Sequence, residues 1–200
     1  MTLATFLSVF IKRNISYKER IVLSQSLSLN DTSGMVRLAK HIVMGTLLFE
    51  GSGALILSTR FIKDYGFFGG IVKGIFTSVS AFCNAGFDIM GEKEAFVNMT
   101  GYVNDLPVNI TVMALIVIGG LGFFVWEEIY NWPRTKKISL YSKLVLAITA
   151  FLILFGAICF FFFEFENPDS IQNLSPKGKI LASFFQSVTP RTAGFNTLNL

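Results

Sequence analysis

Stretches without a charged residue constrain this chain more than any other feature of its sequence. Residues 144–163 are twenty consecutive residues without a charged side chain, and residues 106–126 are twenty-one more. A third apolar stretch, 42–59, contains a single charge, Glu50. About 20 apolar residues in a helix cross the ~30 Å hydrocarbon core of a bilayer. These stretches therefore predict an all-α integral membrane protein that crosses the membrane several times.

The composition agrees with this class and argues against several others. Hydrophobic residues make up 52% of the chain and charged residues 15%, against about 25% charged residues in an average soluble domain. Disordered, collagen-like and coiled-coil chains do not have this composition. The two cysteines lie in apolar surroundings and give no disulfide framework. With a single histidine and no HExxH or GxSxG pattern, we expect no enzyme, no catalytic residue and no cofactor.

The distribution of charge predicts the orientation in the membrane. Residues 12–40 and 127–143 together hold ten of the 17 basic residues and carry a net charge of +6. Basic residues collect in the cytoplasmic loops of membrane proteins. We therefore expect these two segments in the cytoplasm, and residues 91–105 and 164–178 outside. The net charge of +4 is explained by these loops, so nucleic acid is not an expected partner.

Two further apolar stretches, 67–82 and 180–188, are too short to cross a bilayer and predict re-entrant half-helices. Each ends in a similar phrase, SVSAFCNAGFD at 78–88 and SVTPRTAGFN at 187–196, with the glycines 108 residues apart. The chain thus repeats the order of span, half-helix, glycine loop and span, which indicates an internal repeat.

The glycine loops carry the candidate chemistry. Non-helical backbone at membrane depth occurs only where it is buried in protein or lines a water-filled cavity. Carbonyl oxygens in such a loop can replace the hydration shell of a potassium ion, and the negative end of the preceding half-helix favours a cation. The expected filter residues are Asn84, Ala85, Gly86 and Phe87, and Thr192, Ala193, Gly194 and Phe195. The residues alone leave a second interpretation open, in which both loops are tight turns at packed helix ends.

At these loops the chain resembles a known family. SAFCNAGFD and SVTPRTAGFNT are similar to the second and third filter segments of the Trk/Ktr potassium-uptake membrane subunits, and GGLGF at 119–123 resembles a phrase in the helix after a filter. The phrases resemble those of the B-type Ktr subunits, also known as subunit J of sodium V-type ATPases. The resemblance implies a bacterial plasma-membrane protein with four helix–pore loop–helix units like those of a potassium channel. It also implies potassium as the transported ion, with sodium possible, a homodimer, and a cytosolic nucleotide-binding regulatory subunit.

The resemblance further implies that this chain holds about two of the four units. The expected segments are the end of the last helix of repeat one (1–11), a cytoplasmic connector (12–37), repeat two (38–130), a cytoplasmic loop (131–143) and the start of repeat three (144–200). Within repeat two we expect a helix, then a half-helix and filter at 67–88, and a second helix at 106–126. Within repeat three we expect a helix at 144–163, a half-helix at 176–189 and a filter at 192–196. The first and fourth filters are absent. A non-conducting remnant or a structural membrane subunit is therefore the alternative function.

Two charged residues are candidates for filter support. Glu50 lies inside an apolar stretch, where a carboxylate is a functional-site candidate; the alternative is a hydrogen bond or ion pair between helices. Arg191 precedes the second loop and is expected to brace it, because a cation in the ion path would repel potassium. For the glycines at 119–122 we expect close helix packing. No metal site other than the potassium filter is expected.

Overall fold

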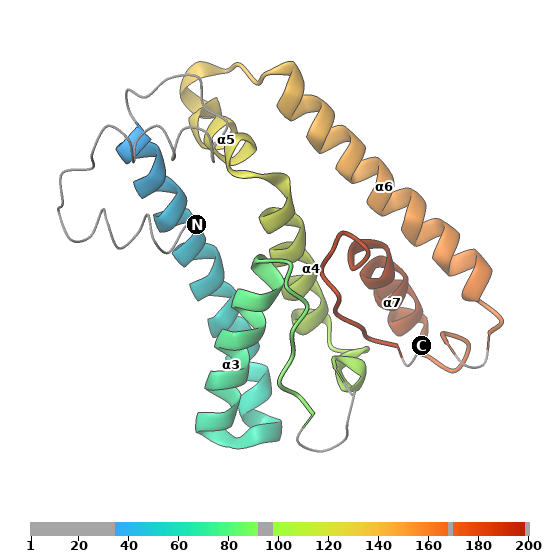
Figure 1. Cartoon of the computed structure of the whole chain (residues 1–200). Coiled ribbons are helices and arrows are strands. Elements are labelled where there is room, and N and C mark those ends of the chain that lie inside the picture. Colours follow the sequence, from blue (N-terminus) through green and yellow to red (C-terminus); the bar gives the residue numbers. More distant parts are fainter. Residues whose placement is uncertain (1–34, 92–97, 168–169, 199–200) are drawn as a thin grey trace. The chain divides into compact units, whose positions relative to one another are not determined.

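The computed structural model describes residues 35–91, 98–167 and 170–198 (Figure 1). The described residues form helices, turns and loops without a β-strand, as the sequence predicts. The predicted first segment, 1–11, and nearly all of the predicted connector lie outside the described residues. The chain divides into two compact units, Met1–Phe49 and Glu50–Leu200, and α3 (Met35–Phe82) begins in the first of them. The contacts described below lie within the second unit.

The helices include spans long and apolar enough to cross a membrane. His41–Phe82 within α3 and Leu140–Glu164, which is α6, each meet this requirement. A third span results if Leu106–Leu121 (α4) and the helix after it are taken as one bent span. The described residues thus provide two or three candidate spans, in agreement with a membrane protein.

Helix α3 contains a hairpin. Its 48 residues would extend for about 72 Å if straight, but the backbone breaks at Gly66, where φ is 75° and ψ is 174°. The part after Gly66 then runs back along the residues just before it, as Figure 1 shows for the cyan and green parts of α3. A Cβ atom on Gly70 would lie 2.4 Å from the backbone nitrogen of Ile62, and one on Gly74 would lie 2.2 Å from the Ser58 hydroxyl. These two glycines allow residues 67–82, the predicted first half-helix, to pack closely against the part of α3 before the break.

The predicted helix 106–126 is divided in two. It begins as expected, because the Asp105 carboxylate accepts a hydrogen bond from the Val108 amide at 3.2 Å. The first part, α4 (Leu106–Leu121), ends at Gly122, whose φ of 86° is outside the helical range. Helix α5 (Phe123–Thr135) continues at 97° to α4. The indole of Trp126 donates a hydrogen bond to the carbonyl of Ile118 across the bend at 2.9 Å, which holds the two helices at this angle.

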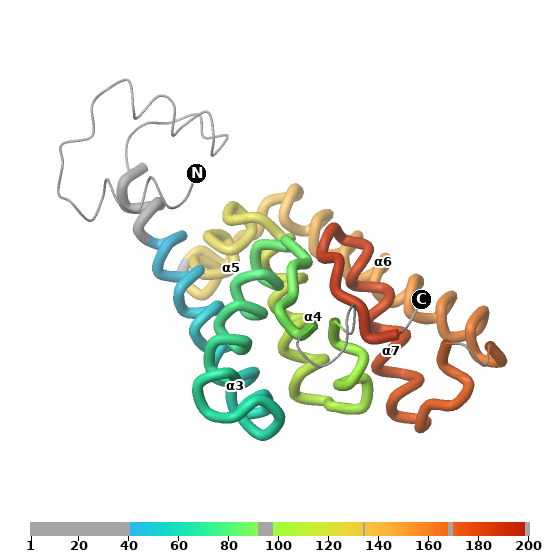
Figure 2. The backbone as a smooth tube through the Cα atoms, turned by 60° about the horizontal axis from the view of Figure 1, so that its bottom comes forward, coloured from blue at the N-terminus to red at the C-terminus, as the bar shows by residue number. Residues whose placement is uncertain are grey.

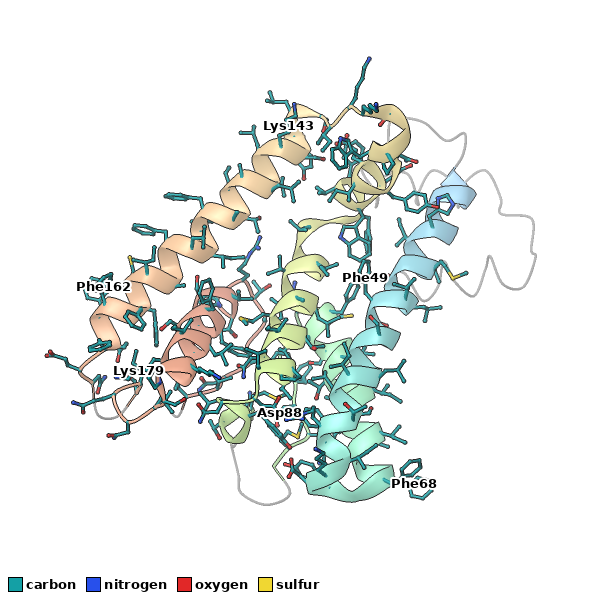
Figure 3. All side chains as sticks on the ribbon, turned by 180° about the vertical axis from the view of Figure 1, so that it is seen from behind. Phe49, Phe68, Asp88, Lys143, Phe162 and Lys179 are labelled. Atoms are coloured by element: carbon teal, nitrogen blue, oxygen red, sulfur yellow. The ribbon has the colours of Figure 1, made fainter. Side chains whose placement is uncertain are left out.

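The last two helices cover most of the residues predicted to begin repeat three. Helix α6 (Leu140–Glu164) is slightly longer than the apolar stretch 144–163, and α7 (Pro176–Val188) corresponds to the second half-helix. Ser175 caps α7 by accepting a hydrogen bond from the Gly178 amide at 3.1 Å. Figure 3 labels Phe162 near the end of α6, where its ring points away from α7. Its side chain is among many exposed apolar side chains of α6, as expected for a helix that contacts lipid.

Candidate functional site

The two glycine loops lie against each other, although 108 residues separate their glycines. A Cβ atom on Gly86 would lie 2.3 Å from the Ala193 carbonyl oxygen and 2.9 Å from the Gly194 Cα. A Cβ atom on Gly194 would lie 3.3 Å from the Gly86 Cα. Figure 2 shows the segment after α3 and the segment after α7 side by side. No side chain fits at Gly86 without displacing the backbone of the other loop.

The two loops also share an unusual backbone conformation. The φ angle is positive at Asn84 (51°) and Gly86 (70°), and again at Thr192 (70°) and Gly194 (72°). In both loops a left-handed residue therefore stands at the first and third positions. Such conformations are rare outside glycine and asparagine, and for a β-branched residue such as threonine they are strained. Strain of this kind concentrates at ligand-binding sites, where the surrounding structure enforces it.

A hydroxyl group from the preceding half-helix holds each loop. The Ser80 hydroxyl donates a hydrogen bond to the Phe87 carbonyl at 2.7 Å. The Thr189 hydroxyl donates one to the Phe195 carbonyl at 2.5 Å. Ser80 and Thr189 are the third residues of the repeated Ser-Val-Ser/Thr phrase, and both acceptors are the phenylalanines of Ala-Gly-Phe. These bonds orient the two phenylalanine carbonyls toward the half-helices.

The residue after each phenylalanine closes the loop in the same way. The Asp88 carboxylate accepts a hydrogen bond from the Met90 amide at 3.0 Å. The Asn196 side-chain oxygen accepts one from the Leu198 amide at 3.1 Å. Both side chains bind the backbone two residues ahead, which is the Asx turn that aspartate and asparagine favour. The backbone is therefore fixed at both ends of each loop.

Each half-helix is fastened to the preceding long helix by the first serine of the repeated phrase. The Ser78 hydroxyl donates to the Glu50 carbonyl at 2.7 Å, and the Ser187 hydroxyl donates to the Ile153 carbonyl at 2.7 Å. Sequence reasoning found the repeated serines but not their acceptors, because the acceptors are backbone groups on distant elements.

A glycine lies opposite each of these serines. A Cβ atom on Gly53 would lie 2.6 Å from the Ser78 hydroxyl, and one on Gly156 would lie 2.5 Å from the Ser187 hydroxyl. Each glycine stands three residues after the carbonyl that accepts the serine hydrogen bond. Small residues let helices approach closely enough for such contacts. The serine–glycine pair is thus a matched feature of the two segments that the sequence analysis missed.

The glycines at 119–122, for which we expect close helix packing, include two that lie against the residues that begin the first loop, Phe82 and Asn84. A Cβ atom on Gly119 would lie 2.0 Å from the Phe82 carbonyl oxygen. A Cβ atom on Gly120 would lie 3.4 Å from the side-chain nitrogen, Nδ2, of Asn84. The side-chain oxygen of Asn84 is buried and accepts no hydrogen bond from the residues that the structure describes. Packing of α4 therefore directly shapes the surroundings of Asn84.

The two predicted supporting residues contact different parts of the unit. The Glu50 carboxylate lies 4.0 Å from the thiol of Cys83, the residue before Asn84. The Arg191 guanidinium donates a hydrogen bond to the Thr149 hydroxyl on α6 at 3.1 Å. Each predicted supporting side chain thus joins a long helix to the region where a loop begins.

Comparison with known proteins places the chain in a family. The TrkH family, described as a cation transport protein, matches residues 4–200. The potassium/sodium uptake protein NtpJ of Enterococcus hirae is 38% identical over 188 residues, which are 94% of this chain and 40% of NtpJ. The Ktr system potassium uptake protein B of Bacillus subtilis is 35% identical over 199 residues, which are 100% of this chain and 44% of that protein.

A further relative, the Ktr system potassium uptake protein B of Vibrio alginolyticus, is 33% identical over 204 residues. The chain spans between 40% and 44% of the length of these three relatives. The family is one of transport proteins rather than enzymes. With its apolar spans, the chain is a membrane protein that belongs to the TrkH family of cation transport proteins.

Proposed function

We propose that this chain is part of a potassium-translocating subunit of a bacterial Ktr/Trk uptake system, located in the plasma membrane. The observation that carries the proposal is the contact between Gly86 and the Ala193–Gly194 backbone, which brings two glycine loops of the same conformation together. Relatives named as potassium uptake proteins match the chain over at least 94% of its length. Potassium moves down its electrochemical gradient, without a chemical step or a cofactor.

Backbone carbonyls of the two loops serve as ligands for the ion. The two half-helices end at Phe82 and Val188, just before Asn84 and Thr192, so the partial negative charge of each helix C-terminus adds to the attraction. Carbonyl oxygens around a narrow path replace the hydration shell of potassium, and selectivity over sodium depends on their number and position. The remaining carbonyls come from the other two units of the intact protein. Sodium is a possible second ion, as in the name of the Enterococcus relative.

The partners follow from the same assignment. The relatives named Ktr system proteins belong to systems of more than one component. We propose a homodimer in the lipid bilayer and a cytosolic nucleotide-binding regulatory subunit that binds the basic cytoplasmic segments. Copurification of the intact protein with its partners, followed by native mass spectrometry, tests both statements. A monomer without a bound soluble subunit would contradict them.

A pair of glycine variants tests the filter. Gly86 and Gly66 both have positive φ angles, of 70° and 75°, so serine strains the backbone at either position. A Cβ atom at Gly66 meets nothing within 4 Å, whereas one at Gly86 meets the Ala193 carbonyl. In the complete protein, Gly86→Ser should lower the potassium-to-sodium uptake ratio about tenfold, which corresponds to ~1.4 kcal/mol. Gly66→Ser should leave the ratio unchanged.

Both variants are compared by ion uptake in cells that lack their own potassium transporters, normalised to inserted protein. An unchanged ratio in Gly86→Ser would show that the loops are packing turns. The alternative function, a non-conducting remnant or structural subunit, is tested by the flanking DNA. Reading frames for two more half-helix–glycine loops support the transporter, and stop codons at both ends would support the remnant.

A further inference from the structure

A buried lysine contacts the segment that leaves the first loop. Lys73 lies in the returning half of α3 and is 3% exposed. Its ammonium group donates a hydrogen bond to the Ile89 carbonyl at 2.5 Å. The same ammonium group lies 4.6 Å from the centroid of the Tyr65 ring. Ile89 follows Gly86 by three residues, so the lysine is tied to the end of the candidate filter.

Burial of this charge requires an explanation. A lysine side chain is almost never fully buried without a partner, because removing an ammonium group from water is costly. A carbonyl acceptor and an aromatic face both offset this cost. A methionine would fill similar space without any desolvation cost. Packing alone therefore does not account for a lysine here, and its hydrogen bond to the loop is the specific feature that an apolar residue cannot provide.

The second loop lacks this lysine. Lys73 stands five residues before Ser78, and the residue five positions before Ser187 is Ala182, which is fully buried. On the second half-helix, the Gln186 side chain instead donates to the Asn196 side-chain oxygen at 2.8 Å. The hydroxyl bonds and Asx turns are the same in the two loops. The charged contact distinguishes the first loop from the second.

We propose that Lys73 is a positioning residue for ion selectivity. Its ammonium group holds the Ile89 carbonyl and thereby fixes the end of the first loop, so that the carbonyls around Gly86 keep their distance to the ion. The proposal rests on the filter function proposed above. Because selectivity depends on the placement of carbonyl dipoles, loss of this bond changes the discrimination between ions more than the total amount of protein.

Three variants of Lys73 in the complete protein test this role. Lys73→Met keeps an unbranched apolar side chain and removes the donor, and should lower the potassium-to-sodium uptake ratio about tenfold. Lys73→Gln keeps a neutral donor on a shorter side chain and should lower the ratio about threefold. Lys73→Arg keeps the charge and the donor and should restore most of the selectivity. The ratio is measured by potassium and sodium uptake in transporter-deficient cells, normalised to inserted protein.

Lys179→Met is the matched control. Lys179 lies in the other half-helix, α7, and its ammonium group also lies over an aromatic ring, 4.2 Å from the centroid of Phe165. This variant should leave the ion ratio unchanged. If Lys73→Met does not reach the membrane, Lys73→Gln decides the question by the same ratio.

Two results would overturn the proposal. A wild-type potassium-to-sodium uptake ratio in Lys73→Met would show that the lysine serves the fold alone. If the Lys73→Met protein does not reach the membrane, the same ratio in Lys73→Gln would show this. An equal loss in Lys179→Met would show that any half-helix lysine has this effect. Failure of the filter itself is distinguished by Gly86→Ser: if Gly86→Ser lowers the ratio and Lys73→Met does not, the filter stands and the role of Lys73 is refuted.

Discussion

The two segments predicted to be re-entrant, residues 67–90 and 176–198, have matching loops in different surroundings. Both loops have positive φ angles at the first and third positions, and both are held by a hydroxyl bond to the phenylalanine carbonyl. Yet the Phe87 side chain is 70% exposed, whereas that of Phe195 is 1% exposed. The shared residues determine the backbone conformation of each loop. Residues outside the shared phrase determine how far the phenylalanine side chain of that loop is buried.

The most decisive test of the comparison concerns the side of the membrane from which the half-helices enter. If both enter from outside, a cysteine at Gln172, just before α7, should react with an impermeant thiol reagent on intact cells, and a cysteine at Lys137 should not. Both side chains are exposed. The background is the complete protein with Cys83 and Cys159 replaced by serine. The opposite labelling pattern would reverse the orientation for both segments.

A large energetic difference is expected between the two phenylalanines. Phe195→Ala should cost about 3–5 kcal/mol of stability, because it removes a buried aromatic ring. Phe87→Ala should cost less than about 1 kcal/mol in this chain, because most of its ring is already exposed. Thermal unfolding of the purified chain in detergent, followed by tryptophan fluorescence, compares them. Equal losses would mean that the ring of Phe87 is covered and that the two segments do not differ in this way.

The smallest expected effect separates the first residues of the two loops. Asn84 and Thr192 have similar positive φ angles, 51° and 70°, but asparagine tolerates this conformation and threonine does not. Thr192→Gly should therefore stabilise the protein by up to about 1 kcal/mol, whereas Asn84→Gly should be neutral or slightly destabilising. The same unfolding measurement applies. Destabilisation by Thr192→Gly would show that the hydroxyl, which donates to the Arg191 carbonyl, outweighs the strain.

Local features of the fold could be predicted from the sequence. Asp105 and Ser175 cap α4 and α7 as their positions before proline-containing helix starts indicate. A helix precedes each repeated phrase, as these local signals indicate, and the re-entrant character of the two helices stays a prediction. The same phrases contain the eight candidate filter residues, whose role as ion ligands stays a prediction.

Features that depend on distant contacts could not be predicted. Gly122 lies in an uninterrupted apolar stretch, so nothing local distinguishes a bend of 97° from a straight helix. The contact of Gly120 with Asn84 joins two segments far apart in the sequence. In the sequence, Lys73 is a single charge in a short apolar stretch, and nothing near it predicts the hydrogen bond from its ammonium group to the Ile89 carbonyl. In each case the deciding neighbour comes from another element.

The central claim, that the two loops share one cation site, is tested most directly by locating the ion. Crystals of the complete protein soaked in thallium or rubidium, which substitute for potassium, would be measured at the absorption edge of the metal. We expect an anomalous peak between the two loops, within coordination distance of backbone carbonyls at 84–86 and 192–194. Sodium should displace the metal from this site only when sodium is in large excess. A transported ion whose anomalous peaks lie elsewhere in the protein, with none between Gly86 and Gly194, would contradict it.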